Sequence, residues 1–95
     1  MNDRLRVKIE FDSAKRQATL ELRGLDFADT AQIFEGRTLG FEDDRKDYGE
    51  IRIITFGFIA ERLVACVWTE RDGKRRIIAL RKANDDERAI FDEQA

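Results

Sequence analysis

Residues 51–82, "IRIITFGFIAERLVACVWTERDGKRRIIALRK", decide the fold. This segment holds runs rich in β-branched and aromatic residues, which are typical of strands, at positions 51–59, 63–69 and 75–81. The tripeptide Ala60-Glu61-Arg62 is short enough to turn between the first two as antiparallel neighbours. Asp72-Gly73 joins the last two and is a strong hairpin signal, because a two-residue turn requires positive φ angles. The segment therefore predicts an antiparallel meander.

The residues before the meander predict a strand and two helices. Apolar and charged residues alternate from Leu5 to Phe11, as they do in a strand with one buried face. A helix over residues 13–22 follows, with Asp12 as its N-cap and Gly24 at its end. We expect a second helix from Asp26 to Gly36, because apolar residues form a stripe along it.

Three further segments complete the expected fold. Residues 37–41 can form a short strand, and the polar residues 42–49 read as a loop and a candidate mobile segment. After the meander, Asn84 and Glu87 make a capping-box pattern that predicts a final helix of about ten residues. The order βααβββ(β)α predicts an α+β fold, with helices on one face of a mainly antiparallel sheet.

Composition limits the class of protein. A chain of 95 residues with 42% apolar residues predicts one globular domain over residues 1–95. No apolar run is long enough for a membrane span or a signal peptide, so we expect a cytoplasmic protein that does not contact membranes. The chain has no histidine and one cysteine, Cys66, which we expect to be a buried hydrophobe. These counts exclude a zinc set of imidazoles and thiolates and His-dependent nucleophile systems, and we expect no metal or other cofactor.

Positive charge is concentrated in the meander. Lys and Arg minus Asp and Glu give −3 for residues 1–44, +5 for residues 45–82 and −4 for residues 83–95, which sum to the net charge of −2. A phosphate-binding face needs such an asymmetry. A charged antiparallel sheet also needs a solvated face, so charge alone leaves both interpretations open.

The meander also holds the residues best suited to chemistry. Trp68 and Glu70 point to the same side of their strand, whereas residues 75–81 alternate between two faces whose relation to Trp68 depends on the register. A face with a tryptophan, a carboxylate and arginines suits single-stranded RNA, because the ring stacks on a base and guanidiniums bind phosphate. The alternative is a cross-strand ion pair beside a half-buried core tryptophan.

The same residue types could cleave RNA. Glu70 would take the proton of a ribose 2′-hydroxyl, and an arginine would stabilise charge on the phosphoryl oxygens. The arginines considered for this role are Arg52, Arg76 and Arg81. Because arginine is a poor acid, the proton donor would be Lys46, Lys82, Tyr48 or water.

Three stretches of the chain belong together: "IEFDSAKRQATLELRGLDFADTAQIF" at 9–34, "YGEIRIITFGF" at 48–58 and "RLVACVWTERDGKRRIIALRKANDDERAIF" at 62–91. They resemble the BrnT family of toxins from type II toxin-antitoxin systems. The shared patterns include F-D-x-x-K, G-E-x-R-x-x-x-x-G and T-E-R, in the same order and at the same spacing. Members often carry a histidine at the places of Arg23 and Trp68, and usually a serine at the place of Ala79.

The resemblance implies a compact RelE-like fold and a metal-independent endoribonuclease that inhibits translation. It also implies a partner, a small BrnA-like, ribbon-helix-helix-like antitoxin that neutralises the toxin and alone contacts operator DNA. The positions that match the family are Glu50, Arg52, Glu70, Arg71, Arg76, Arg81 and Lys82, with Glu70 and Arg81 as leading candidates. For RNA binding we expect Trp68, Lys46, Tyr48 and Arg71. The alternative function is a non-catalytic, toxin-like module that only binds an antitoxin or nucleic acid.

Overall fold

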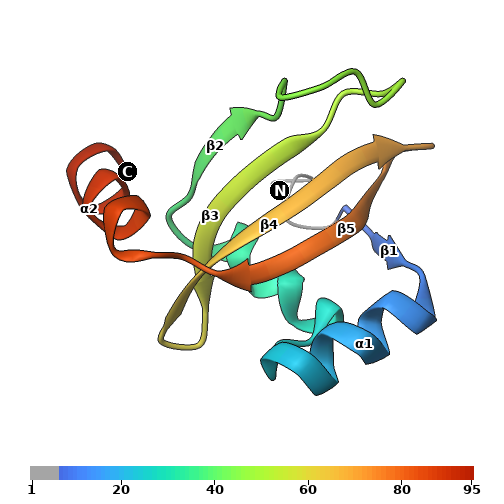
Figure 1. The fold of residues 1–95 in the computed structure, drawn as a ribbon, viewed down its shortest axis with the longest axis horizontal. Coiled ribbons are helices and arrows are strands. Elements are labelled where there is room, and N and C mark those ends of the chain that lie inside the picture. Colours follow the sequence, from blue (N-terminus) through green and yellow to red (C-terminus); the bar gives the residue numbers. More distant parts are fainter. Residues whose placement is uncertain (1–6) are drawn as a thin grey trace.

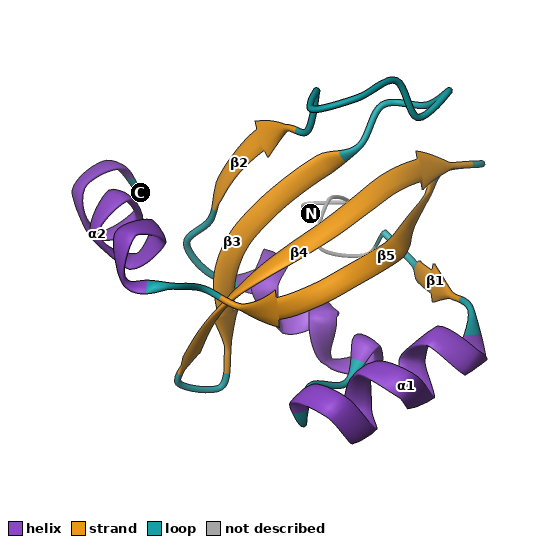
Figure 2. Ribbon diagram, viewed as in Figure 1, coloured by secondary structure: helices purple, strands orange, loops and turns teal. Residues whose placement is uncertain are grey.

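The computed structural model describes residues 7–95 and has an α+β fold with a five-stranded sheet and three helices (Figures 1 and 2). The elements are β1 (Ile9–Phe11), α1 (Ser13–Arg23), η2 (Phe27–Glu35), β2 (Leu39–Glu42), β3 (Ile53–Ile59), β4 (Arg62–Arg71), β5 (Lys74–Lys82) and α2 (Asp85–Gln94). The predicted order is confirmed. The part of the first predicted strand at residues 5–6 lies outside the described residues.

The sheet is mixed, with the strand order β1-β5-β4-β3-β2. The pairs β2–β3, β3–β4 and β4–β5 are antiparallel, and the pair β1–β5 is parallel. Asp72 and Gly73 have φ angles of 55° and 78°, which confirms the predicted two-residue turn. Ala60, with a φ of 55°, begins the turn between β3 and β4.

The ends of the helices follow the predicted capping residues, with two differences. Gly24 ends α1 with a φ of 68°, and Asn84 and Glu87 form a complete capping box at α2. Asp12 occupies the N-cap position of α1, but its side chain makes no capping hydrogen bond. The Asp26 side chain caps the second helix, which is a 3₁₀ helix rather than an α-helix.

The two faces of the sheet are covered by different helices. We call the side on which α1 and η2 pack the helical face; Val64, Cys66 and Trp68 of β4 point to it. We call the opposite side the open face; Leu63, Ala65, Val67 and Thr69 point to it. Figure 1 shows α1 and η2 beneath the sheet and α2 standing apart from them.

The prediction that all helices share one face is wrong for α2. Its only buried residue, Phe91, is fully buried against a core cluster of the open face that contains Phe56, Leu63 and Ala65. The reason is that β3 and β4 carry apolar side chains on both sides, so both sides need cover. Because α2 is short, it covers only one end of the open face.

A β-bulge at Ile78 changes the alternation in β5. Val67 pairs with Ala79, but the next residue, Trp68, pairs with Ile77, so Ile78 has no partner in β4. Ile77 and Leu80 are therefore both buried in the core under the helical face. The prediction that odd and even residues of 75–81 lie on opposite faces is wrong for this strand.

Candidate functional site

The bulge brings two candidate arginines onto the open face. Directly paired residues of antiparallel strands point to the same side of a sheet. Arg76 pairs with Thr69 and Arg81 pairs with Ala65, and both partners belong to the open face. A regular strand would have placed Arg76 and Arg81 on opposite sides.

An apolar strip separates these two arginines. It is a row of paired residues that crosses four strands and consists of Phe41, Ile54, Val67 and Ala79. The ring of Phe41 is 45% exposed at the edge of the sheet, and the other three side chains are half-buried. The middle of the open face is therefore accessible and apolar, with guanidiniums on either side.

Besides Arg76 and Arg81, a cluster of charged residues lies at the end of the sheet beyond Arg76, where β3 begins and β4 ends. Arg52 precedes Ile53, which pairs with Trp68 on the helical face, so alternation turns Arg52 to the open face. Its Nε donates to Glu50 Oε2 at 3.2 Å. Nη2 of Arg71 donates to the other oxygen, Oε1, at 3.3 Å. Arg71, 21 residues from Glu50 in sequence, thus joins Glu50 and Arg52 in one cluster.

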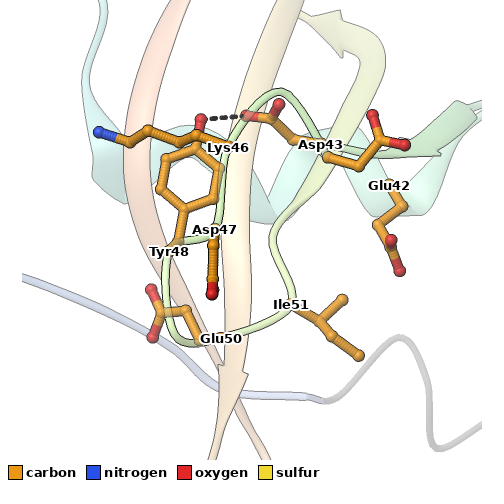
Figure 3. Close-up of a pocket in the computed structure, with 8 residues that line it drawn as sticks. Glu42, Asp43, Lys46, Asp47, Tyr48, Glu50 and Ile51 are labelled. Atoms are coloured by element: carbon orange, nitrogen blue, oxygen red, sulfur yellow. Dashed lines mark hydrogen bonds between the residues drawn. The ribbon is translucent and has the colours of Figure 1, made fainter.

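The loop between β2 and β3 adds Tyr48 and Lys46 to this cluster (Figure 3). The Tyr48 hydroxyl donates to Asp43 Oδ2 at 3.2 Å. The Arg52 guanidinium lies 4.0 Å from the centroid of the Tyr48 ring, and Lys46 Nζ lies 5.1 Å from it. Beside the ring is a cavity of about 320 Å³, lined by Glu42, Asp43, Asp44, Lys46, Asp47, Tyr48, Glu50 and Ile51.

The arginines of β5 are held by carboxylates from other elements. Arg81 makes two hydrogen bonds of 2.7 and 2.8 Å to Glu87 of α2. These bonds raise the pKa of Arg81 and lower the pKa of Glu87. Arg76 donates to Glu10 of β1 at 3.0 Å. Both arginines are thereby oriented before any ligand binds.

Three predicted site residues lie on the helical face instead. Trp68 is half-buried; its Nε1 donates to the Thr55 hydroxyl at 2.9 Å, and its ring meets Phe34 edge to face. Glu70 and Lys82 are exposed. In the register of β4 and β5, Glu70 is opposite Arg75 and Lys82 is opposite Val64. The sheet therefore lies between Glu70 and Arg81, the two leading candidates, and it separates Lys82 from Arg81 as well.

Sequence reasoning missed the carboxylates that organise the open face. Asp43 is only 5% exposed and accepts hydrogen bonds from Arg45 and Tyr48, although the sequence suggested an ordinary polar loop. Glu10 is 66 residues away from Arg76 in sequence, and Glu87 belongs to a different element from Arg81. The available signal was weak: an acidic residue two positions before an arginine and five before the chain's only tyrosine.

The remaining predictions concern cysteine, metal and membrane. Cys66 is fully buried, as expected, and burial raises the pKa of its thiol to about 12. Within residues 7–95, no cluster of cysteine and acidic side chains is arranged to hold a metal ion. In the same range, no helix has the length and apolar character that crossing a membrane requires.

Comparison with known families identifies the chain. The sequence model of one family, described as the ribonuclease toxin BrnT of type II toxin-antitoxin systems, matches residues 11–87. This match includes every element from α1 to β5 and all the arginines of the open face. A search of curated proteins gave no match. The chain therefore belongs to the BrnT family of type II toxin-antitoxin ribonuclease toxins.

Proposed function

We propose that this protein inhibits translation by cleaving single-stranded RNA on its open face. The observation that carries the proposal is the bulge at Ile78, which brings Arg76 and Arg81 to the face that already holds Arg52. Guanidiniums bind phosphate oxygens through paired hydrogen bonds, and the apolar strip offers a dry surface for bases. This face therefore combines the two features that single-stranded RNA binding needs.

Within this site, Glu50 is the proposed general base. Its carboxylate accepts hydrogen bonds from Arg52 and Arg71, whereas Glu70 lies on the face opposite Arg76 and Arg81. Glu50 would accept the proton of a ribose 2′-hydroxyl while that oxygen attacks the adjacent phosphate. The products are a 2′,3′-cyclic phosphate and a chain with a free 5′-hydroxyl.

The neighbouring groups supply charge stabilisation and a proton. Arg52 and Arg71 lie beside Glu50 and would stabilise the negative charge that develops on the phosphoryl oxygens. The leaving 5′-oxygen needs a proton, which Tyr48, whose ring contacts Arg52, or Lys46 beside that ring would supply. Arg76 and Arg81 would hold phosphates along the rest of the strand.

The proposed partners follow from the same face. An antitoxin that covers the apolar strip would exclude RNA from it. We assign this role to a small ribbon-helix-helix-like antitoxin, through which alone the complex would contact operator DNA, in the cytoplasm. Type II toxin-antitoxin membership supports an antitoxin partner of some kind.

One observation favours the alternative, a toxin-like module that binds without cleaving. The observation is that the arginines in and around the site form ion pairs with carboxylates. The arginines are Arg45, Arg52, Arg71, Arg76 and Arg81, and their partners are Asp43, Glu50, Glu10 and Glu87. Five positive and four negative charges leave these ion pairs with a combined charge of only +1. Such a surface attracts RNA weakly at a distance. RNA binding therefore depends on phosphates replacing the carboxylates as partners of the arginines once the RNA is in contact.

Cleavage of a labelled single-stranded RNA and inhibition of cell-free translation test the proposal. We expect Arg52→Ala and Glu50→Gln to lower the cleavage rate by about 100-fold, the usual effect of removing a group that stabilises the transition state. The controls are Lys82→Ala and Glu70→Gln on the helical face, which should stay within about threefold of the wild type. Loss of cleavage in the controls but not in Arg52→Ala or Glu50→Gln would refute this site. Tight RNA binding without cleavage by the wild type would favour the alternative.

A further inference from the structure

Asp43, the first residue of the loop between β2 and β3, has a buried carboxylate. Its side chain is 1% exposed. Oδ1 accepts a hydrogen bond from Arg45 Nε at 2.7 Å, and Oδ2 accepts from Arg45 Nη2 at 2.8 Å. Oδ2 also accepts from the Tyr48 hydroxyl at 3.2 Å. The carboxylate thus ties three positions of one loop together.

Apart from this carboxylate, the loop is held by other polar contacts and not by the core. It contains no residue of either core cluster, and Ile51, its only aliphatic side chain, is 66% exposed. The backbone N–H of Asp43 donates to the Arg52 carbonyl at 2.7 Å, which closes the base of the loop. At its far end, Gly49 adopts a φ of 74° and donates to the side chain of Asp47. Between these points, Asp43 provides the contact that fixes Tyr48.

The ring of Tyr48 in turn contacts and orients the side chain of Arg52. The guanidinium lies 4.0 Å from the centre of the Tyr48 ring, and its Nε donates to Glu50. A guanidinium that is stacked on a ring and paired with a carboxylate has few orientations left. The contacts therefore run from Asp43 through Tyr48 and Arg52 to Glu50, the proposed base.

We propose that Asp43 is the positioning residue of the site: by holding the Tyr48 hydroxyl, it fixes Arg52 and Glu50 in the geometry that cleavage requires. The catalytic part of this inference rests on the proposed function. Asp43 itself lies beneath Arg45 and Tyr48, so it acts through them and not on the RNA. Reaction rates are sensitive to such placement, because a displacement of about 1 Å can cost about 100-fold.

The test compares Asp43→Asn with Asp44→Asn, an equal change of charge at the exposed neighbouring residue. We expect Asp43→Asn to lower kcat for RNA cleavage at least tenfold and to change KM less than threefold, because the phosphate contacts of Arg76 and Arg81 remain. Tyr48 is the only tyrosine, so its ring protons give one unambiguous set of NMR signals. The nuclear Overhauser effect between this ring and the Arg52 side chain should disappear in Asp43→Asn and persist in Asp44→Asn.

Two results would overturn the inference. One is a Tyr48–Arg52 Overhauser effect that persists in Asp43→Asn, whatever happens to kcat. The other is an equal loss of kcat in Asp44→Asn. If Asp43→Asn does not fold, Tyr48→Phe removes only the hydroxyl donor, and the contact between the substituted ring and Arg52 must then weaken. If the wild type cleaves no RNA, the proposed function fails, and the Overhauser comparison still decides whether Asp43 sets the loop.

Discussion

Replacing Gly57 by alanine should destabilise the protein, whereas the same change at Gly40 should not. Gly57 lies in β3 on the helical face, directly under η2. A Cβ built there lies 2.7 Å from Ile33 Cγ2 and 3.4 Å from both the Ile33 carbonyl oxygen and Thr38 Cγ2. At Gly40 in β2 the nearest atom, the Thr55 hydroxyl oxygen, is 3.7 Å away, which is ordinary contact.

Two opposing effects set the magnitude. Either substitution removes freedom from the unfolded chain and stabilises the fold by about 0.4–1 kcal/mol. At position 57 the clash must also be relieved, and Ile33 is fully buried, so its side chain has no free space to enter. Overpacking of this kind costs about 1–3 kcal/mol. We therefore expect Gly57→Ala to lose about 1–2 kcal/mol of unfolding free energy and Gly40→Ala to lose none.

Urea unfolding followed by tryptophan fluorescence measures this difference. Trp68 is the only tryptophan, and its ring contacts Phe34 of η2, the helix that the new methyl group would push. A difference of about 2 kcal/mol in unfolding free energy between the two variants corresponds to a difference of roughly 10 °C in melting temperature for a domain of this size. Equal stability of both variants, or a more stable Gly57→Ala, would refute the packing that places η2 against β3.

Two further predictions concern α2 and acid stability. Phe91→Ala should lower the free energy of unfolding by about 3–5 kcal/mol, because Phe91 is fully buried. Ile90→Ala, at a position that is 43% exposed, should lower it by less than about 1 kcal/mol. Urea unfolding followed by circular dichroism compares the two variants, and equal losses would contradict the docking of α2. Asp26 and Asp43 have pKa values lowered to about 2, mainly by hydrogen bonds from Arg16 and Arg45, so their stabilisation is complete above pH 3.8 and is lost as the pH falls through 2. Melting temperatures should therefore drop between about pH 4 and pH 2, and Asp26→Asn should reduce that drop; a flat profile in the wild type would contradict both ion pairs.

Local signals predicted most of the fold. Asp72-Gly73, Gly24 and the Asn84–Glu87 capping box act over a few residues, so their effect does not depend on the rest of the chain. The bulge at Ile78 could not be predicted in this way. Because Ile77, Ile78 and Leu80 are all apolar, the strand supports two alternation patterns. Packing decided between them, since Ile77 and Leu80 both fill the core under the helices.

The candidate site was less predictable than the fold for the same reason. The strand parity of Trp68 and Glu70 was correct, because both point to one side of β4. What the sequence could not show is the register and the bulge of β5, which turn Arg81 to the face opposite Glu70 and Trp68, and which of the two faces α1 and η2 cover. Glu50 and Arg52 belonged to a matching motif, but only the folded loop brings Tyr48 and Asp43 to them.

The ion pairs of the open face suit a site in which RNA phosphates replace carboxylates as the partners of the arginines. An exposed or half-exposed pair of this kind contributes only about 0–1 kcal/mol, so an RNA phosphate can displace a carboxylate from its arginine at low cost. Glu50 holds Arg52 and Arg71 together before RNA binds. In the proposed reaction the phosphate takes over both guanidiniums, and the displaced Glu50 carboxylate is left beside it without its positive partners. The displaced carboxylate is then free to accept the 2′-hydroxyl proton, so binding of the substrate would itself release the group that removes that proton.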